Sequence, residues 1–508
     1  MGQMNKYTIN VYSELVKEQD NLLEEELYGK EQTTIEQLTF DSKKVTENTL
    51  FICKGMAFKE EYLKEAVKNG AVCYISEQKY ELDEDVPYIL VKDIRKAMPV
   101  LANKFFNEAW KELNVIGIGG TKGKSTSVYY MKSILDDYLA ANGKKESAVI
   151  SSIDIYDGVE KIESHITTPE AVELHGYFRN AVNCGMEFVE MEVSSQALKY
   201  GRVNEMMFDV AVFLNICEDH ISPIEHKDFE DYFSSKLLIF QKTKTAVVNL
   251  DADFSDRILE AAQCAPKVVT ISTKNENADF YAYNIHKEGD GTIFNVRCAE
   301  FDKEFELTMP GFFNVENALA TIAVANQFNI PVEFMYSGLK KARSSGRMEL
   351  STSDDNKIIA VVDYAHNKLS FEKLFSSIKE EYPDREIISI FGCPGKKAFT
   401  RRRDLGTIAG KYAKKVYLAA EDPGYEPVEE ISRDIAEYVE AQGCPYEMIE
   451  DRGEAIKKAI ESVENPSILL ITGKGNETRQ KYGCEYVDCP SDTDYVKKYL
   501  DEYNKNHQ

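Results

Sequence analysis

The 508-residue sequence lacks the features of a membrane or exported protein. It has no run of 18 or more apolar residues, which argues against a transmembrane helix. Its first twenty residues lack the apolar core of a secretory signal peptide. The ten cysteines form no C-x-x-C pair, so in a chain without a leader they are interpreted as reduced thiols. We therefore expect a cytoplasmic protein without membrane insertion.

Positive charge is also scarce. The chain has 61 Lys and Arg residues against 86 Asp and Glu residues, a net charge of −25. A surface that follows nucleic-acid phosphates needs the opposite sign, so we expect no nucleic-acid partner. At the usual ~150 residues per domain the length predicts about three domains. The hydrophobic content of 43% is sufficient for their cores.

The stretch GIGGTKGKST, residues 117–126, is the most informative motif. The dinucleotide fingerprint G-x-G-x-x-G fails here, because Lys122 stands where its third glycine is required. The G-K-[ST] ending of a P-loop is present as Gly123-Lys124-Ser125, although the first glycine, Gly117, lies one residue further upstream than usual. A strand pattern precedes the loop and a helical pattern follows it. ATP or GTP with Mg²⁺ is the expected ligand, and a glycine-rich turn that merely contains lysine is the alternative.

Three segments follow from the pattern of strands and helices. Residues 1–112 predict a small α/β domain, residues 113–342 a central domain that contains the P-loop, and residues 343–508 a doubly wound α/β domain. Strands of the last domain are predicted at 357–364, 386–392, 415–420 and 467–473. The final eight residues are predicted to form a frayed tail.

Polar side chains stand where predicted strands end. Glu192 and Ser194 follow one strand, and Asp219 and His220 follow another. A carboxylate and an imidazole beside a P-loop suit Mg²⁺ or phosphate. A strand-end carboxylate paired with lysine and a structural histidine are the alternatives. In the last domain Asp363 ends a strand, where ligands of such sheets bind.

Beyond these residues, a whole series of motifs is similar to one family. In order they read FDSKKV, GTKGKST, HITTPEAVEL, MEVSSQAL, DYFSSK, FNVENALA, SGRME, DYAHN and GKGNE. The chain resembles the Mur ligases, in particular the MurE branch that adds the third residue of the peptidoglycan stem peptide, and most of all its streptococcal lysine-adding type. Departures at Lys122, Gln196 and Tyr200 concern the sugar-peptide contacts.

The resemblance implies a three-domain α/β architecture with a P-loop central domain and a Rossmann-like C-terminal domain. It implies ATP-dependent ligation of L-lysine to UDP-N-acetylmuramoyl-L-Ala-D-Glu (UDP-MurNAc-dipeptide) through an acyl phosphate, by a protein expected to be monomeric. The same ligation with meso-diaminopimelate is an alternative. So are a polyglutamate-type synthetase and a nucleotide-binding regulatory protein without turnover.

The resemblance also implies roles for individual residues. The implied ATP-binding residues are Gly120, Thr121, Lys122, Gly123, Lys124, Ser125, Thr126, Asn314, Arg347 and Asp363. The implied UDP-MurNAc-dipeptide contacts are Ser42, Thr167, Thr168, Ser194 and Arg202. The implied catalytic residues are Lys124, Glu192, His220 and Lys236, and the Mg²⁺ set is Ser125, Glu192, His220 and a carbamylated Lys236.

The amino-acid site is predicted around Glu421, Asp422, Glu426, Gly473 and Glu477. In the diaminopimelate-adding branch an arginine grips the distal carboxylate, and Gly424 stands at that position here. The acids of the segment EDPGYEP favour a side chain that ends in an ammonium, so L-lysine is predicted. Alternatively these acids are solvated loop residues, and an arginine among residues 401–403 binds a carboxylate.

Overall fold

The computed structural model describes residues 5–55, 58–164, 166–219, 221–222, 225–289, 291–344, 346–396 and 399–507. The chain forms two compact units, one of residues 1–271 and 323–334 and the other of residues 272–322 and 335–508. Within the described ranges no helix is long and apolar enough to cross a membrane.

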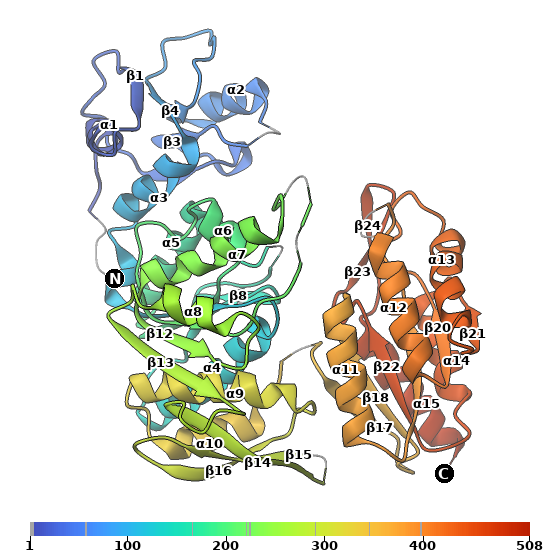
Figure 1. The fold of residues 1–508 in the computed structure, drawn as a ribbon. Helices are drawn as coiled ribbons and strands as arrows, with labels where there is room; N and C mark the ends of the chain where they lie inside the picture. Colours follow the sequence, from blue (N-terminus) through green and yellow to red (C-terminus); the bar gives the residue numbers. More distant parts are fainter. Residues whose placement is uncertain are drawn as a thin grey trace. The chain divides into compact units, whose positions relative to one another are not determined.

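The first unit begins with a five-stranded sheet and its helices (Figure 1). Its order is β1 (Leu22–Glu26), β5 (Tyr88–Val91), β4 (Ala71–Ser76), β3 (Thr49–Ile52) and β2 (Gln37–Thr39). Helices α1 (Ile9–Glu18), α2 (Glu60–Asn69) and α3 (Ile94–Phe105) accompany it. Its buried apolar residues form two cores against the sheet, and one of these cores also includes Ala171 and Val172.

A second sheet of the same unit contains the P-loop. Its order is β13 (Lys267–Ser272), β12 (Thr243–Asn249), β11 (Phe208–Phe213), β6 (Asn114–Gly119), β10 (Phe188–Glu192), β7 (Ala148–Ile150), β8 (Asp154–Tyr156) and β9 (Lys161–Glu163). From β13 to β7 the pairing is parallel, so these strands end at one edge. The helices are α4 (Lys124–Ala141), α5 (Ala171–Asn183), α6 (Ser195–Lys199), α7 (Phe229–Leu237) and α8 (Ser255–Ala262).

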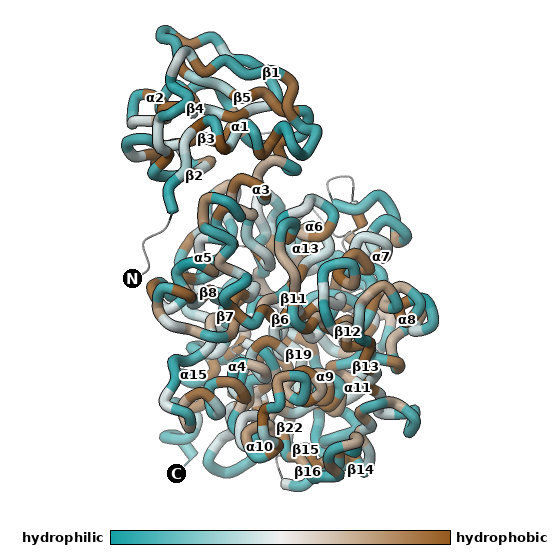
Figure 2. The backbone as a smooth tube through the Cα atoms, turned by 90° about the vertical axis from the view of Figure 1, so that its left-hand side faces the viewer, coloured by the Kyte–Doolittle hydropathy of each residue, from teal (hydrophilic) through white to brown (hydrophobic). Residues whose placement is uncertain are grey.

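Strand β6 lies inside this sheet because its residues are small or apolar on both faces. Val115, Ile116 and Ile118 are fully or almost fully buried. A Cβ added at Gly117 would lie 2.8 Å from the ring of Phe208, so glycine permits the close packing of that ring. Figure 2 shows brown and teal stretches alternating along the chain, as expected where amphipathic elements cover apolar strands.

The second unit contains an antiparallel meander and a doubly wound sheet. The meander consists of β14 (Phe280–Glu288), β15 (Gly291–Arg297) and β16 (Asp302–Leu307). The larger sheet has the order β17 (Glu349–Thr352), β18 (Ile358–Asp363), β22 (Ser467–Thr472), β19 (Glu386–Phe391), β20 (Lys415–Leu418) and β21 (Tyr446–Met448), parallel except for β17.

Five helices and a hairpin accompany the larger sheet. The helices are α11 (Lys368–Glu381), α12 (Phe399–Tyr412), α13 (Val428–Glu440), α14 (Arg452–Glu461) and α15 (Asp492–Asn506), and the hairpin is β23 (Arg479–Tyr482) with β24 (Glu485–Asp488). Helices α9 (Phe313–Gln327) and α10 (Val332–Lys341) each contribute residues to both units.

The predicted strands of the last domain are confirmed, but the predicted frayed tail is wrong. Helix α15 continues to Asn506. Tyr499 and Tyr503 pack in the apolar core of the sheet, and the Tyr503 hydroxyl donates to Asp355 at 3.1 Å. The polar composition of the last residues hid an apolar stripe at helical spacing.

A carboxyl group lies inside the first unit, on strand β10. Glu190 is fully buried, and the Ser147 hydroxyl donates to its Oε1 at 2.7 Å. Among the described residues its Oε2 has no hydrogen-bond partner. Burial raises the pKa of Glu190 to about 8, although Lys132 nearby acts in the opposite direction.

This buried acid predicts a pH dependence of stability. Because folding raises the pKa of this carboxyl, the free energy of unfolding is highest below the unfolded-state pKa of about 4.3. It falls as the pH rises from there through the folded-state pKa of about 8. Glu190→Gln keeps an oxygen for Ser147 and cannot ionise. We expect the melting temperature of this variant to exceed that of the wild type by roughly 3 °C at pH 9, with little difference at pH 5.

The matched control is Glu187→Gln, which changes a half-exposed glutamate just before the same strand. It should reproduce the wild-type profile of melting temperature against pH. If the melting temperatures of Glu190→Gln and the wild type changed in parallel from pH 5 to 9, ionisation of the buried Glu190 would not destabilise the fold, which would contradict the prediction.

Candidate active site

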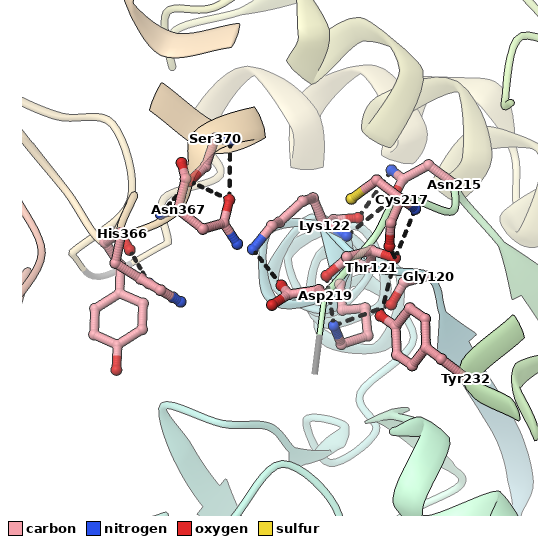
Figure 3. Close-up of polar contacts among 12 residues, drawn as sticks. Gly120, Thr121, Lys122, Asn215, Cys217, Asp219, Tyr232, His366, Asn367 and Ser370 are labelled. Carbon is pink, nitrogen blue, oxygen red and sulfur yellow. Dashed lines mark hydrogen bonds and ion pairs between the residues drawn. The ribbon is translucent and has the colours of Figure 1, made fainter. Parts of the chain in front are cut away.

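The P-loop joins the end of β6 at Gly119 to the start of α4 at Lys124 (Figure 3). Gly120 has a φ of +139° and Gly123 a φ of +86°, values that side chains disfavour. The first N–H groups of α4 have no carbonyl partner within the helix, and the helix dipole is positive at this end. The loop therefore presents a backbone site for an anion.

Asn215, just beyond β11, holds the loop from the side. Its Oδ1 accepts from the Lys122 N–H at 2.9 Å, and its Nδ2 donates to the Lys122 carbonyl at 3.0 Å. Its own carbonyl accepts from the Thr121 N–H at 3.0 Å. Sequence reasoning missed this residue, although an asparagine at a strand end beside a P-loop was a visible signal.

Two lysines donate to carbonyl oxygens of the loop. The Lys124 Nζ donates to the carbonyls of Gly120 and Thr121 at 3.1 and 3.0 Å. The Lys236 Nζ, from α7, donates to the Gly120 carbonyl at 2.7 Å. Lys236 is 4% exposed, and its burial, with the charge of Lys124, holds its pKa well below the usual value. The low pKa favours the uncharged amine form of Lys236.

The side chain of Lys122, which departs from the family pattern, has a partner. Its Nζ forms an ion pair with Asp219 at 3.1 Å, and both side chains are mostly buried. The neighbouring Thr121 hydroxyl lies 3.0 Å from the hydroxyl of Tyr232, which is on α7 as Lys236 is (Figure 3). The ion pair with Lys122 thus connects Asp219 to the loop. The predicted ligand His220 lies outside the described residues.

Ser125 and Glu192 are linked through a third residue. The hydroxyls of Ser125 and Ser152 lie 3.2 Å apart, and the Ser152 hydroxyl and N–H donate to Glu192 Oε1 at 3.0 and 2.8 Å. A hydroxyl and a buried carboxylate are the oxygen ligands that suit Mg²⁺, which takes few protein ligands and completes its shell with phosphate and water. No cluster of three or more acidic, histidine or cysteine side chains with metal-binding geometry occurs among the described residues.

Three of the five residues predicted to bind the sugar-peptide form one cluster. The Thr168 hydroxyl donates to the Glu192 carbonyl at 2.9 Å and accepts from the Ser194 N–H at 3.0 Å. Arg202 donates to the Thr168 carbonyl at 3.0 Å and pairs with Glu170 at 3.0 Å, which Lys54 also contacts.

The other two predicted residues are not joined to this cluster by hydrogen bonds that the structure describes. Thr167 is half-buried beside it in sequence. Ser42 lies in the first sheet's domain, where its hydroxyl donates to Glu65 at 2.5 Å.

In the second unit the polar residues at the end of β18 are ordered by backbone groups. Asp363 accepts from the N–H groups of Met348 and Ala365 at 2.9 and 2.8 Å. The Arg347 guanidinium lies 4.6 Å from the centroid of the Tyr364 ring. Asn314, also in this unit, donates to the Pro310 carbonyl at 2.6 Å. Figure 3 also shows Asn367 and Ser370 capping the start of α11.

Lys474 lies at the centre of the predicted amino-acid residues. Its Nζ pairs with Asp422 at 3.0 Å and with Glu477 at 2.6 Å. Burial alone would lower the pKa of Lys474, but the two carboxylates outweigh it and raise that pKa above its usual value. A buried cation, which the sequence analysis did not predict, thus lies between two of the predicted acids.

Glu421 and Gly473 lie against each other. A Cβ added at Gly473 would be 2.2 Å from Glu421 Oε2, so only glycine fits there. Burial raises the pKa of Glu421 to about 7, although nearby cations act in the opposite direction. This carboxyl is therefore partly protonated near neutral pH.

Glu426 is already paired within the protein. Arg402 donates to both of its oxygens, at 2.8 and 2.7 Å, and also contacts Asp434 at 2.7 Å. Arg403 pairs with Asp404. Two of the three arginines considered as an alternative carboxylate clamp thus have carboxylate partners of their own.

Comparison with known proteins decides the family. A model described as the Mur ligase middle domain matches residues 118–325, and one described as the Mur ligase, glutamate ligase domain matches residues 346–475. The UDP-N-acetylmuramoyl-L-alanyl-D-glutamate--L-lysine ligase of Enterococcus faecalis is 37% identical over 89% of this chain and 88% of its own. The chain belongs to the Mur ligase family.

Two further relatives agree with this assignment. The UDP-N-acetylmuramyl-tripeptide synthetase of Ligilactobacillus salivarius is 35% identical over 94% of this chain and 96% of its own. The solved structure of a UDP-N-acetylmuramoyl-L-alanyl-D-glutamate--2,6-diaminopimelate ligase superposes with a TM-score of 0.67 at 24% identity, covering 99% of this chain and 100% of that one. The three-domain Mur ligase fold predicted from the motifs is confirmed.

Proposed function

We propose that this Mur ligase joins L-lysine to UDP-MurNAc-L-Ala-D-Glu at the expense of ATP, in the synthesis of peptidoglycan precursors. The observation that carries the proposal is full-length similarity to L-lysine ligases, of which the Enterococcus faecalis protein is one. The intact phosphate loop, with Lys124 and Lys236 on its carbonyls, supports it chemically. The need for ATP and a nucleotide-linked substrate places the reaction in the cytoplasm.

The chemistry needs two bond-forming steps. A carboxylate oxygen of the D-Glu residue attacks the γ-phosphorus of ATP, which releases ADP and leaves an acyl phosphate. The amine of lysine then attacks the carbonyl carbon, and the bond to the phosphate oxygen breaks as the amine loses a proton. Catalysis consists mainly of positioning and of stabilising the developing charge.

The residues of the P-loop fit the first step. Backbone N–H groups of residues 120–126 would hold the phosphates, and Lys124 would exchange its carbonyl partners for phosphate oxygens. Ser125 and Glu192, with His220, would hold Mg²⁺, which supplies charge neutralisation at the phosphates when bound. Asn314, Arg347 and Asp363 are proposed as further ATP contacts, and Ser42, Thr167, Thr168, Ser194 and Arg202 as contacts of the UDP-MurNAc-dipeptide.

Lys236 is proposed to be carbamylated. An uncharged amine can attack carbon dioxide, form a carbamate and release a proton, whereas an ammonium cannot. Burial and Lys124 keep the pKa of Lys236 low, which makes the uncharged amine available. The carbamate would carry a negative charge toward a metal ion that an ammonium would repel.

We propose L-lysine rather than meso-diaminopimelate as the amino-acid substrate because of the charged residues in the second unit. Gly424 offers no guanidinium to a distal carboxylate, and Arg402 is already bound to Glu426 and Asp434. Asp422 and Glu477 flank the same region, where an ammonium meets opposite charge.

The amino-acid preference can be measured directly. At fixed ATP and UDP-MurNAc-dipeptide, we expect kcat/KM for L-lysine to exceed that for meso-diaminopimelate by at least tenfold, because a distal carboxylate lacks a donor and faces acids. ADP release should require both the dipeptide substrate and the amino acid. A tenfold preference for diaminopimelate would overturn the lysine assignment, and absence of stimulated ADP release would overturn the ligase proposal.

If Lys236 is carbamylated, the activity of the enzyme should depend on the charge of the side chain at position 236. Lys236→Arg retains a cation that cannot be carbamylated, and we expect its kcat to fall by on the order of 100-fold. Lys236→Ala should be similarly impaired and partly rescued by a short carboxylic acid such as acetate. Wild-type activity should fall in buffer depleted of carbon dioxide and return with bicarbonate.

The control for this prediction is Lys244→Arg, an exposed lysine paired with Asp209. It should keep wild-type kcat. Full activity in Lys236→Arg would show that no carbamate is needed.

A further inference from the structure

A buried histidine that no role above uses lies between β11 and α7. His226 is fully buried. Its Nε2 lies 2.9 Å from the Ser195 hydroxyl, and its Nδ1 lies 3.3 Å from Oδ2 of Asp231. Burying an imidazole without polar partners is unfavourable, so these two contacts stabilise the ring in its place. Each ring nitrogen thus has a partner on a different element, Ser195 on α6 and Asp231 on α7.

The carboxylate in this set of contacts is ionised. Lys199 donates to Asp231 at 2.6 Å and, together with the Lys227 N–H and His226, holds the pKa of Asp231 below its usual value. Because a carboxylate only accepts hydrogen bonds, an ionised Asp231 favours a proton on Nδ1 of His226. In the neutral ring, Nε2 then accepts from the Ser195 hydroxyl.

A serine, a histidine and an aspartate joined in this order are also the groups of a hydrolytic triad. A nucleophilic serine must reach its substrate, but Ser195 is only 4% exposed and His226 is not exposed at all. The three residues therefore connect parts of the fold and do not serve as a nucleophile with its base.

The contacts of His226 connect two predicted substrate sites of the first unit. Ser195 begins α6 and follows Ser194, which belongs to the cluster predicted to bind the sugar-peptide. The His226 ring packs against the buried Tyr232, with ring centroids 5.2 Å apart and planes at 71°. The Tyr232 hydroxyl lies 3.0 Å from the Thr121 hydroxyl in the phosphate loop (Figure 3). A buried path of side chains thus joins the turn before α6 to the phosphate loop.

Two residues that depart from the family pattern contact the same stretch of chain between β11 and α7. Lys122 pairs with Asp219 at 3.1 Å, and Gln196 donates to Oε1 of Glu225 at 3.3 Å. Lys199 adds a hydrogen bond to the Glu225 carbonyl at 3.1 Å. These departures therefore support the same connection, from the phosphate loop at one end and from α6 at the other.

We propose that His226 is a positioning residue, which holds the phosphate loop at a fixed distance from the turn that begins α6. The proposal rests on the ligase function proposed above, in which the loop holds ATP and the turn contacts the substrate that carries the carboxylate. The carboxylate oxygen can attack the γ-phosphorus only when the two atoms are aligned at about 3–3.5 Å. His226 is buried away from both substrates, so it affects the chemical step through the relative position of their sites.

Three variants test this role through kcat. His226→Leu removes both polar contacts, and Ser195→Ala removes the contact on α6. We expect each to lower kcat by about tenfold or more, while KM for ATP and for UDP-MurNAc-dipeptide changes by less than about threefold. His226→Gln has an amide oxygen that can accept from the Ser195 hydroxyl, and we expect its kcat to stay within about threefold of the wild type. Combining Ser195→Ala with His226→Leu should cost no more than His226→Leu alone.

The thiol of Cys217 reports on the same connection without turnover. Cys217 is half-buried, and its N–H donates to the Thr121 hydroxyl at 3.2 Å. Its labelling by N-ethylmaleimide can be followed by mass analysis of peptides. We expect labelling of Cys217 to be about tenfold faster in His226→Leu and Ser195→Ala than in the wild type or His226→Gln, because the phosphate loop opens more often. The exposed Cys264 is the internal control and should react at one rate throughout.

The matched control variant is His286→Leu, which changes an exposed histidine on β14 and should keep the wild-type kcat and labelling rate. Unchanged kcat in Ser195→Ala, a variant too conservative to prevent folding, would overturn the proposal. So would a loss of kcat without faster labelling of Cys217, or a loss in His226→Gln as large as in His226→Leu. If the wild type ligates no amino acid but the labelling rates differ as expected, the proposed function fails while the connection through His226 stands.

Discussion

The carbonyl oxygen of Gly120 accepts from two lysines, and the chemistry of the first unit depends on that arrangement. The loop can present its N–H groups to an anion only if its carbonyls point away and find donors. Lys124 and Lys236 supply those donors, and Asn215 fixes the next peptide from the other side. Burial and the charge of Lys124 hold the pKa of Lys236 well below its usual value, which favours the uncharged amine that reacts with carbon dioxide.

The second unit uses buried charge for a different purpose. Arg452 with Asp492, and Lys474 with Asp422 and Glu477, join the starts of two helices and the loop after β22. Each pair lies at the carboxyl edge of the sheet, where desolvation makes an unpaired charge costly. These pairs fix the positions of the charged side chains around the loop after β22 and the starts of α14 and α15.

Much of the fold was predictable because local signals agreed with it. Val115, Ile116 and Ile118 before the glycine loop indicated a buried strand, and the apolar runs of the last domain indicated its parallel sheet. The helix at the C-terminus was missed because Tyr499 and Tyr503 were outnumbered by polar neighbours. Ion pairs between residues that are distant in the sequence, such as Glu426 with Arg402, have no local sequence pattern from which they could be predicted. The assignment of His220 to Mg²⁺ stays a prediction.

The central claim is that the phosphate loop serves to activate a carboxylate as an acyl phosphate. The most direct test uses UDP-MurNAc-dipeptide labelled with ¹⁸O in the D-Glu carboxylate, with ATP and L-lysine, followed by mass analysis of the inorganic phosphate. The account predicts that each phosphate released carries one ¹⁸O atom from the carboxylate, because the bond that breaks joins the carbonyl carbon to that oxygen. Phosphate that carries no label from the carboxylate, and takes its fourth oxygen from water, would contradict it.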